Sequence, residues 1–375
     1  MSQINANSIY DASGGQSARL YGVSMRNGGT GWVNRIINGN MVIDQRNAGA
    51  SVTPTNGQFT VDRWNGYASQ ASKFSVQRNA GSVTPPAGFT NYLGVTSLSA
   101  YSVLAADYFS INQPIEGFNT ADLAWGTASA ATVTLSFWVR SSLTGTFGGS
   151  LQNGNQDYCY PFSYTVSSAN TWEQKTVTIL GPTSGTWLTA NQGGIYLSFS
   201  LGVGSTNSGT AGSWTSGLRL SATGATSVVG TNGATFYITG VQLEAGSVAT
   251  PFERRDYGRE LIMCYRYFWR AWHRIGNSGN NQPYPGFVTG AATGTASFSA
   301  NVTFPVTMRA TPTLAFYRDG VSGAIWNVDT AGAVTGLSLA QGWFDVNGIS
   351  GMIFSGTPLT SGVRYGCDFD ISSEL

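Results

Sequence analysis

Charge is scarce in this sequence of 375 residues. Lys and Arg number 19, Asp and Glu 18, and charged residues make up 10% of the chain, against about 25% in an ordinary soluble domain. With a formal net charge of +1, the chain lacks the basic stripe by which proteins attract nucleic acid. We therefore expect no nucleic-acid partner.

Histidine and cysteine are scarce as well. His273 is the only histidine, so the sequence offers almost no residues from which to build a Ser-His-Asp triad or a multi-histidine zinc site. Cys159, Cys264 and Cys367 are widely spaced and form no CxxC pair. Such a set is typical of reduced, buried cysteines in a protein made in a cytoplasm. The sequence predicts no catalytic residue, no metal site and no cofactor.

Long apolar runs are also missing. Leu261 to Tyr265 is the longest strictly apolar run that we find, whereas a membrane-spanning helix needs about 20 such residues. The first residues, Met1 to Asn7, have neither the basic nor the apolar part of a secretory signal. We expect neither membrane insertion nor signal-directed secretion.

What the sequence does have is glycine, hydroxyl residues and aromatics arranged in short alternating runs. There are 49 glycines, and aromatics make up 13% of the chain. The clearest run, residues 131–140, alternates Val133, Leu135 and Phe137 with polar or aromatic neighbours. Period-two runs bounded by turn residues predict strands. Further strands are expected over residues 175–180, 195–201, 234–243, 295–304, 313–317 and 363–370.

These strands predict an all-β protein, an antiparallel jelly-roll sandwich followed by a smaller C-terminal β domain. An island of charge from Glu253 to Arg274 marks the boundary, since residues 176–243 carry only Arg219. Within this island a short helix beginning near Pro251 is expected, handing over to a strand at Tyr265. The expected units are a peptide over residues 1–33, a jelly roll over 34–252 and a C-terminal domain over 253–375.

Three segments resemble a known group of proteins. The first is Asn38 to Arg46, followed by the Asp-Arg-Trp of residues 62–64; the second runs from Gly240 to Arg255 and on to Phe268; the third is Val302 to Pro312. Over about residues 36–315, the chain resembles the tail-fibre and receptor-binding proteins of tailed bacteriophages, which carry a galactose-binding-like, carbohydrate-binding-module-like jelly roll.

The resemblance implies a non-catalytic virion protein, a tail fibre or receptor-binding subunit that recognises a host surface glycan. It implies a homotrimer that is assembled in the bacterial host cytoplasm and joined through residues 1–33 to other tail or virion proteins. Acidic residues within the charge island balance its arginines, which favours subunit contacts over binding of phosphate. The residues expected at this subunit interface are Arg254, Arg255, Arg259, Tyr265 and Tyr267.

Sugar recognition uses aromatic platforms, so loop aromatics flanked by Gly, Asn or Thr are the candidates for a glycan site. Each of them is also a candidate for core or interface packing, because aromatics contribute much of the burial in both. In the first domain the candidates are Trp125, Tyr158, Tyr160, Trp187 and Trp214. In the second domain they are Trp272, Tyr284, Trp326 and Trp343.

Two other functions stay open at this point. A glycan depolymerase needs a pair of carboxylates, and Asp368 and Asp370 alternate on an expected strand, which places them on one face. No β-helix repeat period is visible, which disfavours this function. The other alternative is an adaptor, head-fibre or decoration subunit that assembles with virion proteins and binds no glycan.

Overall fold

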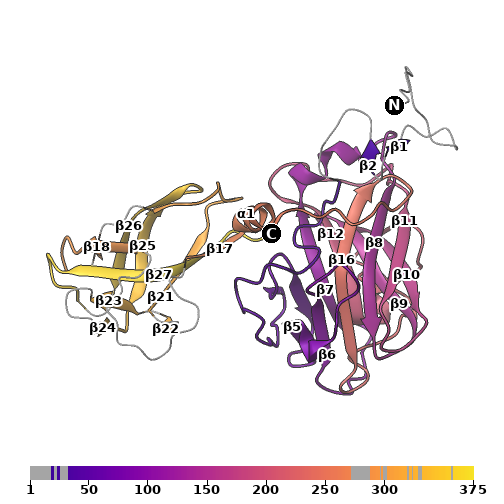
Figure 1. Cartoon of the computed structure of the whole chain (residues 1–375), viewed down its shortest axis with the longest axis horizontal. Coiled ribbons are helices and arrows are strands. Elements are labelled where there is room, and N and C mark those ends of the chain that lie inside the picture. The colour runs from indigo at the N-terminus through magenta and orange to yellow at the C-terminus, as the bar shows by residue number, and fades with distance from the viewer. Residues whose placement is uncertain are drawn as a thin grey trace, which may run out of the picture.

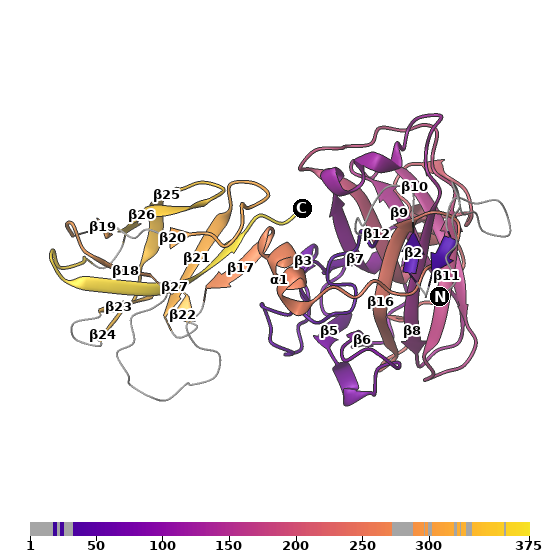
Figure 2. The ribbon, with the colours of Figure 1, turned by 45° about the horizontal axis from the view of Figure 1, so that its top comes forward.

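The computed structural model describes residues 18–20, 23–25, 33–271, 288–295, 297–298, 302–318, 321–322, 324–327, 332–355 and 358–375. Two β bodies lie side by side, with helix α1 (Tyr257–Tyr265) and the C-terminus between them (Figures 1 and 2). The expected all-β class with one short helix is confirmed for this part of the chain. In it, no helix is long and apolar enough to cross a membrane.

The first body is an antiparallel jelly-roll sandwich of two sheets. A seven-stranded sheet has the order β14-β10-β9-β12-β7-β4-β3, and a five-stranded sheet has the order β11-β8-β16-β6-β5. The strands of the first sheet are β3 (Gln58–Phe59), β4 (Asn65–Ala68), β7 (Tyr108–Glu116), β9 (Gly145–Asn153), β10 (Tyr158–Val166), β12 (Gly193–Val203) and β14 (Thr215–Ser216). Those of the second are β5 (Phe74–Arg78), β6 (Leu93–Ser97), β8 (Val133–Ser141), β11 (Glu173–Ile179) and β16 (Thr235–Ala245).

Short elements complete this body. Strands β13 (Ser208–Gly209) and β15 (Ser221–Ala222) pair in parallel. Four 3₁₀ turns are η1 (Ala80–Ser82), η2 (Gly117–Asn119), η3 (Ala121–Leu123) and η4 (Ser205–Asn207). Within the N-terminal stretch, β1 (Ala18–Leu20) pairs with β2 (Val23–Met25). Most of residues 1–33, the expected N-terminal peptide, lie outside the described part of the chain.

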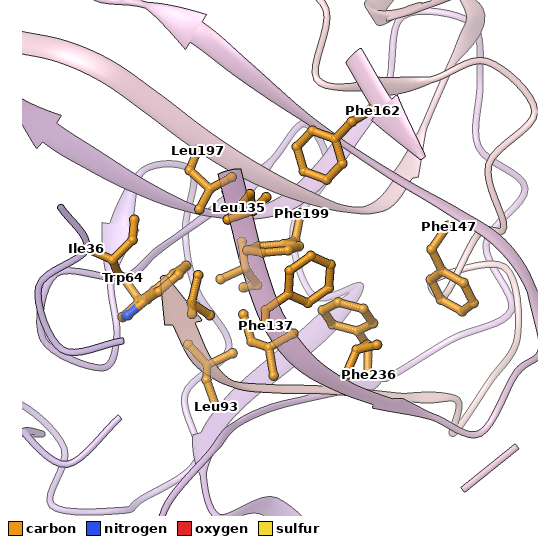
Figure 3. Packing of buried hydrophobic residues seen from close by; sticks show 14 of the residues in the cluster. Ile36, Trp64, Leu93, Leu135, Phe137, Phe147, Phe162, Leu197, Phe199 and Phe236 are labelled. Carbon is orange, nitrogen blue, oxygen red and sulfur yellow. The ribbon is translucent and has the colours of Figure 1, made fainter. Parts of the chain in front are cut away.

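The core lies between the two sheets and is rich in aromatic rings (Figure 3). The alternating residues of the 131–140 run, among them Leu135 and Phe137 of β8, are fully buried. Phe137 meets Phe199 of β12 edge to face, with ring centroids 4.9 Å apart. Burying each such side chain contributes about 1.5–3 kcal/mol, so the alternation that predicts the strands also provides the packing between the sheets.

The second body is built around β27 (Arg364–Ser372). This strand pairs with β17 (Phe268–Ala271), β18 (Val288–Ala291), β21 (Thr313–Arg318) and β23 (Ile325–Asn327). The remaining strands are β19 (Ser297–Phe298), β20 (Val302–Thr303), β22 (Val321–Ser322), β24 (Gly332–Val334), β25 (Ser338–Phe344) and β26 (Gly348–Ser355). The single strand expected over residues 295–304 is thus two short strands, β19 and β20, which both pair with β26.

Helix α1 begins at Tyr257 rather than near Pro251, because Asp256 caps it. The Asp256 carboxylate accepts a hydrogen bond of 2.9 Å from the backbone N–H of Arg259, which satisfies one of the unpaired donors of the first turn. The helix ends at Tyr265, and β17 follows at Phe268. The expected transition from helix to strand is confirmed.

The segments that carry the resemblance meet where α1 joins the jelly roll. The indole N–H of Trp64 donates to the carbonyl of Asn38 over 3.2 Å, and the Asn38 amide donates to the carbonyl of Asp62 over 3.0 Å. The backbone N–H of Asn38 donates to Glu260 of α1. These residues therefore build the junction between the two bodies.

Candidate functional site

Five of the aromatic side chains singled out in the sequence come together at one end of the jelly roll. We call them the aromatic cluster: Trp125, Tyr158, Tyr160, Trp187 and Trp214. Trp125 follows η3, Trp187 lies between β11 and β12, and Trp214 directly precedes β14. The two tyrosines belong to β10. Separate loops thus supply the three indoles.

Trp214 is the centre of the aromatic cluster. Its ring centroid lies 5.4 Å from that of Trp125 and 5.4 Å from that of Trp187. Tyr158 stacks on it with an interplanar angle of 11°, and the centroid of Tyr160 lies 5.3 Å away. Trp125 and Trp187 meet each other edge to face at 4.7 Å. Pairs of this kind add about 0.5–1.5 kcal/mol each to the effect of burial.

Backbone carbonyls hold each indole of the aromatic cluster in place. The Nε1–H of Trp125 donates to Ala131 over 2.7 Å, that of Trp187 to Ser184 over 3.1 Å, and that of Trp214 to Leu180 over 2.7 Å. The polar atom of each ring is therefore engaged within the chain. The rings form a rigid apolar surface rather than a set of mobile hydrogen-bond donors.

Glycine allows two loops to approach the rings closely. Gly126 has φ +85°, and a Cβ there would lie 2.8 Å from Cδ1 of Trp187. Gly185 has φ +90°, and a Cβ there would lie 2.8 Å from Cδ1 of Tyr158. Any side chain at either position would push a ring away and strain the backbone.

A cavity of about 200 Å³ lies beside the aromatic cluster. Its apolar lining comes from Trp125, Trp187, Ile195, Ala121 and Ala124. Because typical sites for drug-sized ligands measure about 300–1,000 Å³, this cavity has room for one small ring and not for a chain of them.

Threonine hydroxyls provide the polar lining of the cavity, through Thr120, Thr127 and Thr189. Thr120 donates its hydroxyl hydrogen to the carbonyl of Gly117 over 3.1 Å, and Thr127 donates to Ala124 over 2.7 Å. Their oxygens can therefore accept hydrogen bonds from a ligand. No charged residue belongs to the lining, so the cavity suits a neutral ligand with hydroxyl donors.

Large apolar side chains are exposed on the same loops. Phe118 of η2 is 61% exposed, and Leu180, whose carbonyl holds Trp214, is 71% exposed. Exposed apolar groups that flank a cavity are typical of a binding surface. The loop end of the sandwich therefore has the features of a ligand site: a cavity, rigid rings and hydroxyl acceptors.

Two aromatic candidates of the second body, Trp326 and Trp343, lie on strands away from this site. Trp326 lies in β23 and Trp343 in β25. Trp272 and Tyr284 lie outside the described residues. Their binding roles stay predictions.

Two of the expected interface residues have partners within the same chain. The Arg255 side chain, 4% exposed, forms ion pairs with Glu253 at 3.2 Å and with Glu260 at 3.4 Å. Tyr267 is fully buried, and its hydroxyl donates to Glu116 over 2.7 Å. Both side chains are therefore engaged within the chain, and their role at a subunit interface stays a prediction.

The other three expected interface residues lie closer to the surface. The Arg254 guanidinium lies over the ring of Phe89, 4.7 Å from its centroid. Arg259 is exposed in the first turn of α1. Tyr265 is partly buried, with its ring centroid 6.3 Å from that of Trp269. An interface role for these three residues stays a prediction.

The acidic pair of the sequence has a structural use. Asp368 and Asp370 of β27 are 9% and 7% exposed rather than solvent-facing. The Asp370 carboxylate forms an ion pair of 2.7 Å with Arg270 of the neighbouring β17.

The three cysteines are free and buried, as the sequence indicates, and burial raises the pKa of Cys159 to about 11.

A buried polar layer on the seven-stranded sheet is a feature that the sequence analysis missed. Asn65, Asn112, Gln152 and Ser200 come from four strands of this sheet, and each is at most 2% exposed. Each carries a side-chain atom without a hydrogen-bond partner among the described residues. Since these atoms have no access to solvent, the loop-end cavity is the better candidate for a ligand site.

No protein-family model matches this chain, and no curated protein matches its sequence. Among solved structures, the enzymatically active domain of bacteriophage CBA120 tailspike protein 4 is similar at 12% identity and a TM-score of 0.33. The match covers 57% of this chain and 22% of the tailspike chain, so the chain spans about a fifth of that protein's length.

Two carbohydrate-binding modules are similar over nearly their whole lengths. The family 11 module of a Clostridium thermocellum cellulase has 13% identity and a TM-score of 0.27, with 53% of this chain and 96% of the module covered. The module TmCBM61, in complex with β-1,4-galactotriose, has 11% identity and a TM-score of 0.26, with 51% and 92% covered. At such scores the likeness carries no argument, and the case for a function rests on this chain's own residues.

Proposed function

We propose that this chain is a non-catalytic, glycan-recognising subunit of a bacteriophage tail fibre or receptor-binding protein. One observation carries the proposal: five aromatic side chains expected to bind sugar from sequence alone form one cluster, and two of them, Trp125 and Trp187, line a neutral cavity with threonines. Sugars present apolar ring faces and hydroxyl donors, and this cavity offers ring surfaces and threonine acceptors. The phage context comes from the resemblance of residues 36–315.

The use of acidic residues supports a non-catalytic role. A glycosidase needs two carboxylates free to transfer a proton and to attack or activate water. Of the pair named in the sequence, Asp370 is held by Arg270 within the sheet. No aspartate or glutamate lines the cavity beside the aromatic cluster.

Retention of the protein on host surface polysaccharide tests the proposal. We would immobilise polysaccharides from a panel of bacterial strains and measure retention of the full chain and of two variants. Trp187→Ala removes one wall of the cavity. Trp172→Ala is the matched control, because Trp172 also packs in an aromatic group and donates its indole N–H to a backbone carbonyl, that of Thr84.

Retention by the wild type and Trp172→Ala, with loss in Trp187→Ala, is the expected outcome. Circular dichroism of both variants should match the wild type, so that loss of binding is not loss of folding. If no polysaccharide retains the wild type, glycan recognition is wrong, and an adaptor or decoration subunit that binds no glycan becomes the better hypothesis. If both variants bind equally well, the protein binds glycan elsewhere and the assignment of this site is wrong.

We further propose that the chain acts as a homotrimer, in which several weak sites would act together. The outward face of α1 supports this, since Tyr257 is 62% exposed and Ile262 is 52% exposed. Light scattering should give about three times the chain mass of 39.6 kDa. A monomer would contradict the trimer while leaving the single-site measurement intact.

A further inference from the structure

The cavity beside the aromatic cluster has a neutral and largely apolar lining, and the inference drawn from it rests on the proposed function. We infer that it takes a single terminal 6-deoxyhexose, a neutral sugar whose hydroxymethyl group is replaced by a methyl group. Three properties of the cavity favour this class of sugar: its size, its charge and its hydrogen-bonding capacity.

Size favours one sugar residue at the end of a chain. A cavity of about 200 Å³ falls below the range of about 300–1,000 Å³ for sites that hold drug-sized molecules. Ile195 of β12 and Ala121 of η3 belong to its lining. A cavity of this size has no room for a linear polysaccharide threaded through its middle.

The absence of charge excludes acidic sugars. None of the lining residues is charged, and the nearest acidic residue in sequence, Asp122, is engaged with Arg35 at 2.6 Å. A carboxylate or sulfate would lose its hydration without gaining a cationic partner, which is strongly unfavourable. The cavity therefore rejects uronic, sialic and sulfated sugars.

The scarcity of free hydrogen-bond donors among the lining side chains disfavours a sugar with an N-acetyl group. Both indole N–H groups of the lining are engaged, with Ala131 and Ser184, and the hydroxyl hydrogens of Thr120 and Thr127 are also donated within the chain. Only one lining side chain, the hydroxyl of Thr189, is left to donate to a ligand. An acetamide carbonyl would compete with the sugar's own oxygens for this one donor.

A methyl group, in contrast, needs no partner. Five of the eight lining side chains are apolar: two alanines, two tryptophans and an isoleucine. A methyl at C6 would lie on this surface, whereas a C6 hydroxyl there would be buried without a hydrogen bond. The threonine oxygens then accept hydrogen bonds from the ring hydroxyls. This division of the lining favours a 6-deoxyhexose over the parent hexose.

Matched pairs of monosaccharides that differ by one oxygen atom test the inference. The probes are methyl α-L-rhamnopyranoside against methyl α-L-mannopyranoside, and methyl α-L-fucopyranoside against methyl α-L-galactopyranoside. Methyl N-acetylglucosaminide and methyl glucuronide complete the set. Dissociation constants for the full chain are measured by ligand-observed NMR, and we expect at least one 6-deoxy sugar to bind about tenfold or more tightly than its parent.

Two variants locate the binding. Ala121→Leu places a larger side chain at the lining, and Ala121 is exposed on a 3₁₀ turn, so the fold should tolerate the change. Ala128→Leu is the control, since Ala128 is exposed on the same loop and does not line the cavity. Binding of the 6-deoxy sugar should be lost in the first variant and unchanged in the second.

Failure of the inference and failure of the proposed function give different results. If a parent hexose, the N-acetyl sugar or the acidic sugar binds as tightly, or if no monosaccharide binds while host polysaccharide still retains the chain, the inference is overturned and glycan recognition stands. If neither polysaccharide nor monosaccharide binds, both are overturned. If Ala121→Leu binds a 6-deoxy sugar normally, the site lies elsewhere.

Discussion

The Glu116 carboxylate lies 2.6 Å from Nη2 of Arg266, although 150 residues separate the two in sequence. Glu116 ends β7 of the jelly roll, and Arg266 follows α1. The carboxylate also accepts from the hydroxyl of Tyr267, and the Arg63 guanidinium lies 3.5 Å from the centroid of that tyrosine ring. These contacts among Arg266, Glu116, Tyr267 and Arg63 join the two bodies at the point where the polypeptide passes from one body to the other.

Glu116→Gln should weaken this junction. The carboxylate is 1% exposed, whereas the Arg266 side chain is 32% exposed and can turn to solvent. The variant therefore loses two charge-assisted hydrogen bonds without leaving a cation buried. We expect the free energy of unfolding to fall by about 1–3 kcal/mol, measured by urea denaturation.

Asp122→Asn provides the control for that measurement. Its ion pair with Arg35 is equally short, 2.6 Å, but the carboxylate is 67% exposed. Exposed pairs contribute about 0–1 kcal/mol, so this variant should be near the wild type. Equal losses in the two variants would contradict the assignment of Glu116 to a buried junction.

Gly240→Ala should destabilise the jelly roll through a close contact. Gly240 has φ +60°, and a Cβ there would lie 2.6 Å from Cζ of Phe89. It occurs where the pairing of β16 with β8 shifts register, between Thr239 and Gln242. Gly224→Ala separates the two causes, because Gly224 has φ +78° and nothing within 4 Å of its Cβ position.

Gly224→Ala should cost about 1–2 kcal/mol for the left-handed backbone alone. Gly240→Ala should cost a further 1–3 kcal/mol or so for the displaced ring. Thermal unfolding of both variants checks the difference. If the two variants have the same melting temperature, Phe89 moves aside without cost and its contact with residue 240 does not affect stability.

Ser200→Ala should leave the protein as stable as the wild type or slightly more stable. The Ser200 hydroxyl is buried without a partner among the described residues, so its removal relieves a desolvation cost. Ser110→Ala is the matched change on the adjacent strand β7. The buried hydroxyl of Ser110 donates to Oδ1 of Asn112 over 3.0 Å, and its loss should cost about 1 kcal/mol. Chemical denaturation should rank Ser110→Ala below Ser200→Ala, and the reverse order would contradict this account of the polar layer.

Local pattern was sufficient to predict four strands of the jelly roll, β8, β11, β12 and β16, whereas others, such as β7, β9 and β10, were not predicted. Along β8 the side chains alternate faces, so burial of Leu135 and Phe137 follows from the two-residue period that the sequence displays. The start of α1 was misplaced because a residue's use as a cap depends on its backbone conformation. Asp256 caps with φ −63° and ψ 153°, an extended conformation that the apolar periodicity does not encode.

The sequence names the aromatic residues of the candidate site but does not predict how they assemble. Trp125 and Trp214 are 89 positions apart, and their contact depends on how three loops fold over the end of the sandwich. For Tyr267 the sequence does not indicate its environment, because the residue lies in an aromatic run that is compatible with both a core and an interface. Only the position of Glu116 and Arg63 in space shows that its ring and hydroxyl both have partners inside the chain.

Asp107 should give the jelly roll a dependence on acid pH. Burial alone would raise the pKa of its carboxyl, but four hydrogen bonds outweigh that effect. Three come from the backbone N–H of Leu104 and the hydroxyls of Tyr101 and Ser69, at 2.9, 2.8 and 2.8 Å, and the fourth comes from the side chain of Gln70. Together they hold the pKa of Asp107 below its ordinary value of 3.8.

Because the folded-state pKa of Asp107 is the lower one, the unfolded chain binds the proton more readily. The stabilisation is therefore complete above the ordinary pKa of 3.8 and is lost as the pH falls through the lowered folded-state value. Asp107→Asn, whose amide cannot accept all of these bonds, should be less stable near neutral pH and should approach the wild type in acid. Melting temperatures across about pH 2–7 test this, with the exposed Ser102→Ala as a control that should follow the wild type. A constant offset between Asp107→Asn and the wild type at every pH would show that the ionised carboxylate has no part in the stabilisation.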